Sequence, residues 1–290
     1  IGVLYSEIGK FRQAYLIYRR GLEFTTQINK PQLEVDFLKN LGALKGEQQD
    51  FNGALSYYRR ALKLAQEQDL RNKLADIYHN LGWISMKQGK YSDAISFYHS
   101  AQQLYKAIDD SRGEGYDYIN LATVSAEMGK WEAMKSYAEN AHHIFFDKVK
   151  DVKGQILALN HLGEAQRELG ELKSALKNHR KAERLSRSCG DIRGLIDAQR
   201  NVGLDYLAQG KFKLALKKME ASLEKAELIS DWEGELEAYF ALIQLHYTRG
   251  SEKQLRKYIG KLKRFGDIKS PYIYGRLKLI LDKEALNRLI

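Results

Sequence analysis

The chain of 290 residues has little cysteine and little proline. The single cysteine, Cys189, excludes an intrachain disulfide and suits a reducing compartment; a small packed side chain explains it better than a catalytic thiol does. The two prolines leave long helices free to run without interruption. The sequence holds no apolar run of about 18 residues, so we expect no membrane-spanning helix and predict a cytoplasmic protein without a membrane partner.

The beginning of the sequence also lacks familiar signals. It shows no secretory signal peptide, and it starts at Ile1, without methionine and inside a repeat. We therefore expect this sequence to be part of a longer protein.

A short turn signature returns along the whole chain at intervals of 40 or 41 residues. It consists of a small or polar residue, a second polar residue and then, in most copies, an aromatic. The third residues of the seven copies are Phe11, Phe51, Tyr91, Trp131, Leu172, Phe212 and Glu252. Repeats of this length stack into a solenoid, which favours binding over catalysis.

The apolar spacing predicts two helices in each repeat. Between residues 74 and 88 apolar residues recur every three or four positions, Gly89 interrupts the pattern, and a second stripe follows between residues 94 and 105. We predict an all-α fold of stacked antiparallel helix pairs. About seven pairs would occupy residues 1–265, the first incomplete and the seventh degenerate, with a capping helical segment at 266–290.

One pattern of small and large residues links the two helices of a pair. It consists of Leu81-Gly82, Gly89, Ala94, Tyr98 and Ala101 and recurs with variations in the other repeats. Small residues let facing helices approach closely, and the larger neighbours fill the remaining space.

This pattern resembles the tetratricopeptide repeat. The repeat is longer than the usual unit of about 34 residues and lacks the closing proline, which makes it similar to the Pins and kinesin-light-chain type and to bacterial Rap-type, MalT-like and signalling-ATPase regulators. The resemblance implies a right-handed superhelical solenoid whose inner groove is lined mainly by the first helix of each pair. It also implies that asparagines at one position of that helix bind an extended peptide backbone.

The sequence carries such asparagines before the Leu-Gly or Leu-Ala pair. In the fifth repeat His161 takes the position, with an asparagine one residue earlier. A primary amide can donate to and accept from a peptide backbone, although it could equally bond a neighbouring helix and organise the stack. The candidate asparagines are Asn40, Asn80, Asn120, Asn160 and Asn201.

Other side chains at helical spacing from the asparagines are candidate groove contacts. Their charges are of both signs, unlike a purely basic clamp for a carboxylate, and their aromatics could anchor a ligand. These candidates are Asp76, His79, Trp83, Tyr116, Arg167, Arg200, Phe240 and Tyr247.

No residue pattern indicates catalysis, a cofactor or a metal. His142 and His143 are adjacent on a predicted helix and point about 100° apart, so they cannot easily share a metal. No phosphate-binding loop and no nucleophile elbow is visible. We predict a non-enzymatic protein without a cofactor.

Two functions remain open from the sequence. The first is a protein- or peptide-binding scaffold, the sensor or regulatory part of a longer protein, whose partner could be another domain of that protein. The second is nucleic-acid binding through the C-terminal end, because residues 249–290 hold 12 Lys and Arg against 4 Asp and Glu, a net charge of +8 out of +10. The basic candidates are Arg249, Lys253, Arg256, Lys257, Lys261 and Arg264.

Overall fold

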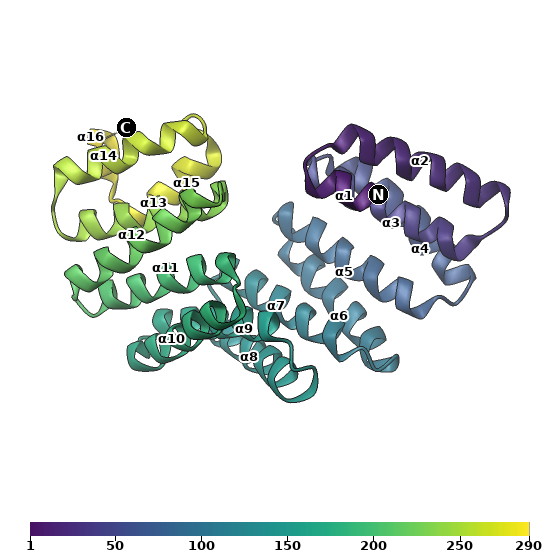
Figure 1. Cartoon of the computed structure of the whole chain (residues 1–290), viewed down its shortest axis with the longest axis horizontal. Helices are drawn as coiled ribbons and strands as arrows, with labels where there is room; N and C mark the ends of the chain where they lie inside the picture. The colour runs from purple at the N-terminus through teal and green to yellow at the C-terminus, as the bar shows by residue number, and fades with distance from the viewer. Residues whose placement is uncertain (290) are drawn as a thin grey trace. The chain divides into compact units, whose positions relative to one another are not determined.

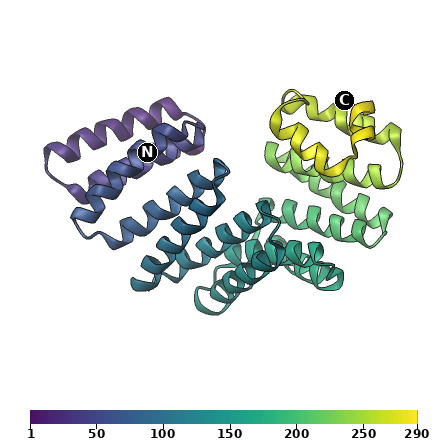
Figure 2. The same cartoon turned by 180° about the vertical axis from the view of Figure 1, so that it is seen from behind.

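The computed structural model describes residues 1–289, except for the side chain of Glu7, and these residues form helices and turns without a strand. Figure 1 shows the helices as consecutive hairpins, and Figure 2 shows them from behind. Their bounds are α1 Gly2–Glu7, α2 Phe11–Gln27, α3 Pro31–Glu47, α4 Phe51–Glu67, α5 Arg71–Lys87, α6 Tyr91–Ala107, α7 Ser111–Glu127, α8 Trp131–His143, the π-helix η1 Ile144–Lys148, α9 Val152–Glu168, α10 Leu172–Cys189, α11 Ile192–Ala208, α12 Phe212–Leu228, α13 Trp232–Thr248, α14 Glu252–Leu262, the 3-10 helix η2 Lys263–Phe265, α15 Pro271–Ile280 and α16 Lys283–Leu289.

The chain forms two compact units. Unit 1 comprises residues 1–130 and 147–149, and unit 2 comprises residues 131–146 and 150–290. The predicted all-α fold of antiparallel helix pairs is confirmed. The predicted array of 1–265 and cap of 266–290 remain a prediction.

The turns between helices follow from capping residues in the sequence. Asp110, Asp191 and Asp231 precede α7, α11 and α13, and each carboxylate accepts a hydrogen bond from the backbone N–H three residues later. This satisfies one of the donors that a helix start leaves unpaired. Within the repeats, Gly89 has a φ of 71°, which glycine adopts without strain and which reverses the chain before α6.

The small and large residues of the repeat pack as the sequence predicts. Gly82 on α5 lies against the ring of Tyr98 on α6, where a Cβ would be 2.7 Å from Cε1. Gly42 and Tyr58 repeat the contact between α3 and α4. Tyr98 is fully buried and Tyr58 almost so, which shows that the missing side chain on the first helix makes room for the ring on the second.

The first helices of successive repeats lie next to each other within each unit. In unit 1, α5 contacts both α3 and α7, and in unit 2, α11 contacts both α9 and α13. The second helices α4, α6, α10 and α12 each contact the first helix before them and the first helix after them. Each unit thus has one face made of adjacent first helices, on which equivalent residues recur from helix to helix.

The end of unit 2 departs from the repeat. α14 is shorter than the other second helices, and two short helices, α15 and α16, follow it where the sequence predicts one continuous helical segment. The break lies at Leu281, whose backbone is extended. Ile273, Leu277 and Leu286 join the same apolar cluster as Leu242 of α13, so this segment covers the last repeat.

Candidate peptide-binding surface

The predicted asparagines of unit 1 occupy equivalent positions on three adjacent helices. Asn40 lies on α3, Asn80 on α5 and Asn120 on α7, and all three are half-buried. Within residues 1–289 their side-chain amides form no hydrogen bond with the rest of the chain. We call these three residues the asparagine ladder. Their amides retain free donors and acceptors, so a stack-organising bond does not occupy them.

Ion pairs between neighbouring first helices surround the ladder. Lys39 of α3 pairs with Asp76 of α5, and Lys73 of α5 pairs with Asp36 of α3 at 2.5 Å. The hydroxyl of Tyr105 also donates to Asp76, at 3.0 Å. Asp76, a predicted peptide contact, therefore joins two repeats, and its half-exposed carboxylate still reaches the surface beside Asn80.

His79 and Asp117 form a second link, between α5 and α7. His79 Nδ1 lies 2.6 Å from Asp117 Oδ1. The His79 and Tyr98 rings meet edge to face, with their centroids 5.9 Å apart. The Asp117 side chain is fully buried, and this burial raises its pKa even though His79 acts in the opposite direction. His79 is 29 % exposed in its side chain, so one edge of the ring remains available to a ligand.

Trp83 contributes a half-buried apolar surface three residues after Asn80. Its ring closes over Gly46 of α3, where a Cβ would lie 2.9 Å from Trp83 Cζ3. Lys87 lies one turn further along α5, with its ammonium 5.7 Å from the ring centre. Tyr116, the other predicted aromatic of unit 1, is half-buried on α7.

The predicted asparagines of unit 2 and Phe240 are less accessible. Asn160 and Asn201 are 8 % and 5 % exposed, and Phe240 is 2 % exposed in the core. The guanidinium of Arg276 covers the Phe240 ring at 5.4 Å. These three residues therefore present almost no side-chain surface to a peptide.

The remaining predicted contacts of unit 2 are engaged within the chain. Arg200 pairs with Asp197 at 3.0 Å on the same helix. Tyr247 donates a hydrogen bond to Asp282, before α16. Arg167 pairs with Asp205 at 3.2 Å and joins α9 to α11.

Asp205 holds a buried polar cluster that sequence reasoning did not find. Its carboxylate is fully buried and lies 2.6 Å from Nδ1 of His179, whose Nε2 lies 3.1 Å from the carbonyl oxygen of Asn160. Asp205 on one side and the Asn160 carbonyl on the other hold the His179 ring in place. The signal lies in the repeat, because Asp205 replaces the Ile84, Val124, Ala165 and Leu245 of other repeats.

The predicted C-terminal basic residues are exposed, but two of them are already paired. Arg256 pairs with Glu252 at 2.7 Å, and Arg264 with the buried carboxylate of Glu235 at 2.6 Å. Tyr258, an aromatic residue of α14 among these basic side chains, is 8 % exposed and packs against Tyr239 and His246. This helix offers charge to a ligand and little aromatic surface.

The described residues show neither a metal-binding cluster nor a membrane-spanning helix. Among residues 1–289 no group of three or more His, Cys, Asp and Glu is placed to hold a metal ion. No helix in this part of the chain is both long enough and apolar enough to cross a membrane.

The tetratricopeptide-repeat family model matches residues 35–107, which include α4, α5 and α6. Residues 35–107 therefore carry tetratricopeptide repeats, and the same kind of helix pair recurs in both units. No curated protein matches the sequence.

Solved structures share the fold. BtubC from P. vanneervenii is 22% identical, with 77% of this chain and 93% of BtubC covered and a TM-score of 0.66. A signal-transduction ATPase with a tetratricopeptide-repeat sensor from Pyrococcus horikoshii is 14% identical. The alignment covers 98% of this chain and 43% of the ATPase, with a TM-score of 0.73. A Rap protein complexed with competence and sporulation factor is 16% identical. The alignment covers 98% of this chain and 85% of the Rap protein, with a TM-score of 0.63.

Proposed function

We propose that this protein is a peptide-binding scaffold and that unit 1 holds an extended segment along α3, α5 and α7. The observation that carries the proposal is the asparagine ladder. Three half-exposed amides, one per repeat, lie on adjacent helices and have no hydrogen-bond partner among the residues that the structure describes. An extended peptide presents a backbone carbonyl and N–H at regular intervals, so a regular series of amides suits it.

The surroundings of the asparagine ladder suit a ligand with both polar and apolar side chains. Asp76 and His79 supply polar groups, and Trp83 supplies an aromatic surface of the kind that dominates binding energy. The ion pairs between α3, α5 and α7 fix the spacing of the asparagines before a ligand arrives. Preorganisation of this kind reduces the ordering that binding requires.

We further propose that the chain acts as the sensor or regulatory part of a longer protein. The similarity to the Pyrococcus horikoshii ATPase supports this, because that protein carries a tetratricopeptide-repeat sensor and this chain covers 43% of it. The Rap protein solved with competence and sporulation factor supports a protein or peptide ligand.

The proposal is tested with a peptide selected on the full chain from a random phage-displayed library. We expect the double variant Asn80→Ala with Asn120→Ala to bind that peptide about 1–3 kcal/mol more weakly, because the peptide's backbone groups lose hydrogen-bond partners. Calorimetry measures the binding free energy. The matched control is Asn52→Ala with Asn140→Ala, which removes two exposed amides from α4 and α8. Equal affinities of the two double variants, both folded, would remove the ladder from the account.

A further inference from the structure

Lysine occupies two positions of the second helix in three successive repeats of unit 2. The first row is Lys173, Lys213 and Lys253, and the second row is Lys177, Lys217 and Lys257, on α10, α12 and α14 in turn. We call these six residues the lysine rows. All six are exposed. Unit 1 shows no such pattern, because Ser92 and Ser96 take the two positions on α6.

The rows are almost unpaired within the chain. Among residues 1–289, Lys173, Lys177, Lys213, Lys217 and Lys253 form no ion pair, and Lys257 lies over the ring of Tyr258 at 5.3 Å. Lysines that serve packing or stability usually have a carboxylate in reach, as Lys218 has in Glu183 at 2.6 Å. Repeated exposed cations without partners leave a concentrated positive field on this face.

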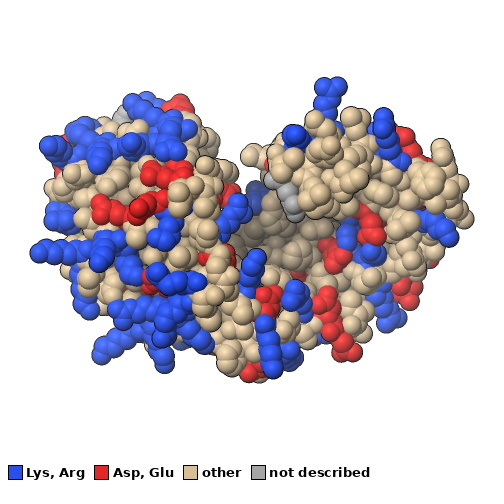
Figure 3. Space-filling model, in the orientation of Figure 1, with Lys and Arg blue, Asp and Glu red and all other residues tan. Residues whose placement is uncertain are grey.

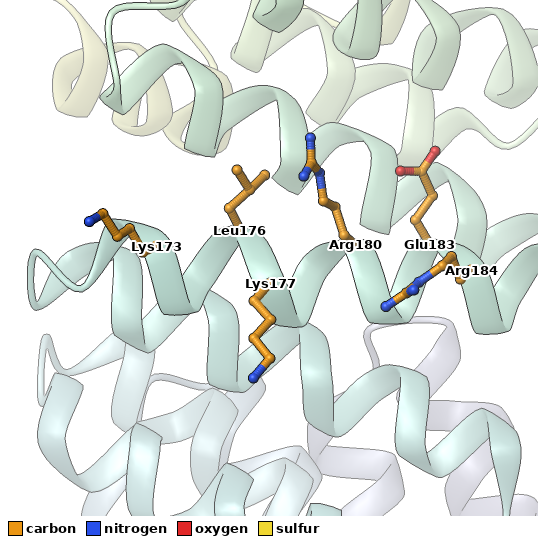
Figure 4. A pocket seen from close by; sticks show the side chains of 6 residues that line it. All are labelled: Lys173, Leu176, Lys177, Arg180, Glu183 and Arg184. Atoms are coloured by element: carbon orange, nitrogen blue, oxygen red, sulfur yellow. The ribbon is translucent and has the colours of Figure 1, made fainter.

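Arginines extend the positive surface along α10. Arg180, Arg184 and Arg187 follow Lys173 and Lys177 at intervals of three and four residues, over about 21 Å of the helix. Residues of α10 line a shallow depression. In Figure 4, the side chains of Lys177 and Arg184 point to one side of this helix, and those of Leu176, Arg180 and Glu183 point to the other. Figure 3 shows Lys and Arg gathered where α10, α12 and α14 lie in Figure 1.

Acidic residues limit the surface to part of the face. Glu220, Glu224 and Glu227 are exposed on the second half of α12, at the positions that Arg180, Arg184 and Arg187 take on α10. The positive surface therefore runs across the first halves of the three helices and then along α10.

We propose that the lysine rows bind double-stranded nucleic acid through its phosphates, without reading sequence. Lysine is a flexible point charge that neutralises phosphates, and a duplex presents one negative charge for about every 1.7 Å of its axis. The two regular rows match such a dense and regular polyanion. Single strands fit less well, because they are held by exposed aromatics, while Tyr258 is buried and Phe212 is half-buried here.

An acidic protein segment fits this face less well than a duplex does. Recognition of a peptide uses amides that bind its backbone and pockets for its side chains. The amide of Asn178 on α10 already donates to Gln166 at 2.8 Å, and the depression on α10 is shallow. Charge is the feature that the three helices share.

The test measures binding of a labelled DNA duplex of about 20 base pairs to the full chain as salt is raised from about 50 to 200 mM. We expect binding at the lower salt and a slope of log K against log salt of about −5, because six neutralised phosphates release their counterions. Lys173→Glu with Lys213→Glu and Lys253→Glu should weaken binding by about tenfold or more and flatten the slope. The matched control, Lys10→Glu with Lys90→Glu and Lys130→Glu, changes three exposed lysines of unit 1 by the same charge and should leave binding nearly unchanged.

Three results would overturn the proposal. The first is no duplex binding at the lower salt, and the second is an equal loss in the control variant. The third is tighter binding of polyglutamate, or of phosphatidylserine vesicles, than of the duplex at the same salt, which would assign the rows to an acidic protein or a membrane surface. The asparagine ladder lies on the first helices of unit 1, so none of these results bears on the peptide proposal.

Discussion

Replacing Asp205 with alanine is expected to lower the free energy of unfolding of unit 2 by about 3–5 kcal/mol, because it leaves the buried His179 ring and the mostly buried Arg167 guanidinium without the carboxylate they share. The Asp205 carboxylate is fully buried and bonds His179 at 2.6 Å and Arg167 at 3.2 Å. The Arg167 side chain is 11% exposed and His179 is fully buried, so water cannot replace the lost carboxylate.

The matched control for Asp205→Ala is Asp197→Ala on the same helix. Asp197 pairs with Arg200 at 3.0 Å, but its side chain is 42% exposed, so its loss should cost about 1 kcal/mol or less. Urea unfolding followed by far-ultraviolet circular dichroism compares the two variants. Equal midpoints for Asp197→Ala and Asp205→Ala would show that the buried cluster is not a source of stability.

Tyr98→Ala is expected to destabilise unit 1 by about 3–5 kcal/mol, since it removes a fully buried ring from the contact between α5 and α6. Gly82→Ala should itself cost about 1–3 kcal/mol, because its Cβ would lie 2.7 Å from Tyr98 Cε1. This clash outweighs the gain of about 0.5–1 kcal/mol that alanine brings to a helix interior.

The two substitutions should be coupled. In the double variant, Gly82→Ala no longer meets the ring, so the total loss should be smaller than the sum of the single losses. Gly260→Ala is the control, because a Cβ at this position in α14 has nothing within 4 Å. Gly260→Ala should bring a small gain in stability. If instead the losses from Gly82→Ala and Tyr98→Ala simply added in the double variant, the contact between Gly82 and the Tyr98 ring would not explain the cost of Gly82→Ala. Thermal unfolding of the four chains measures the cycle.

The fold was predictable because one pattern recurs. A turn signature at intervals of 40 or 41 residues, the pairing of Gly82 with Tyr98, and the aspartate caps each act within one or two neighbouring helices. Local interactions of this kind leave their trace in every copy. The break at Leu281 lies beyond the last regular repeat, where no other copy exists for comparison.

The site was less predictable because it depends on departures from the repeat. Helical spacing places Phe240 with the groove candidates, yet Phe240 is buried beneath Arg276 of α15, which lies outside the repeats. Asp117 and Asp205 link neighbouring repeats from positions that are apolar elsewhere, such as Ile77 and Ile84. Their partners lie on another repeat about 38 residues away or on the second helix, and spacing within one helix does not reveal them.

The most direct test of the peptide-binding account is the location of a bound peptide. A peptide selected on the full chain, carrying a photoreactive phenylalanine analogue, is cross-linked and the modified residues are identified by mass spectrometry. The account predicts cross-links on α3, α5 and α7 around Asn80, His79 and Trp83. Cross-links confined to the second helices α2, α4 and α6, or to unit 2, would contradict it.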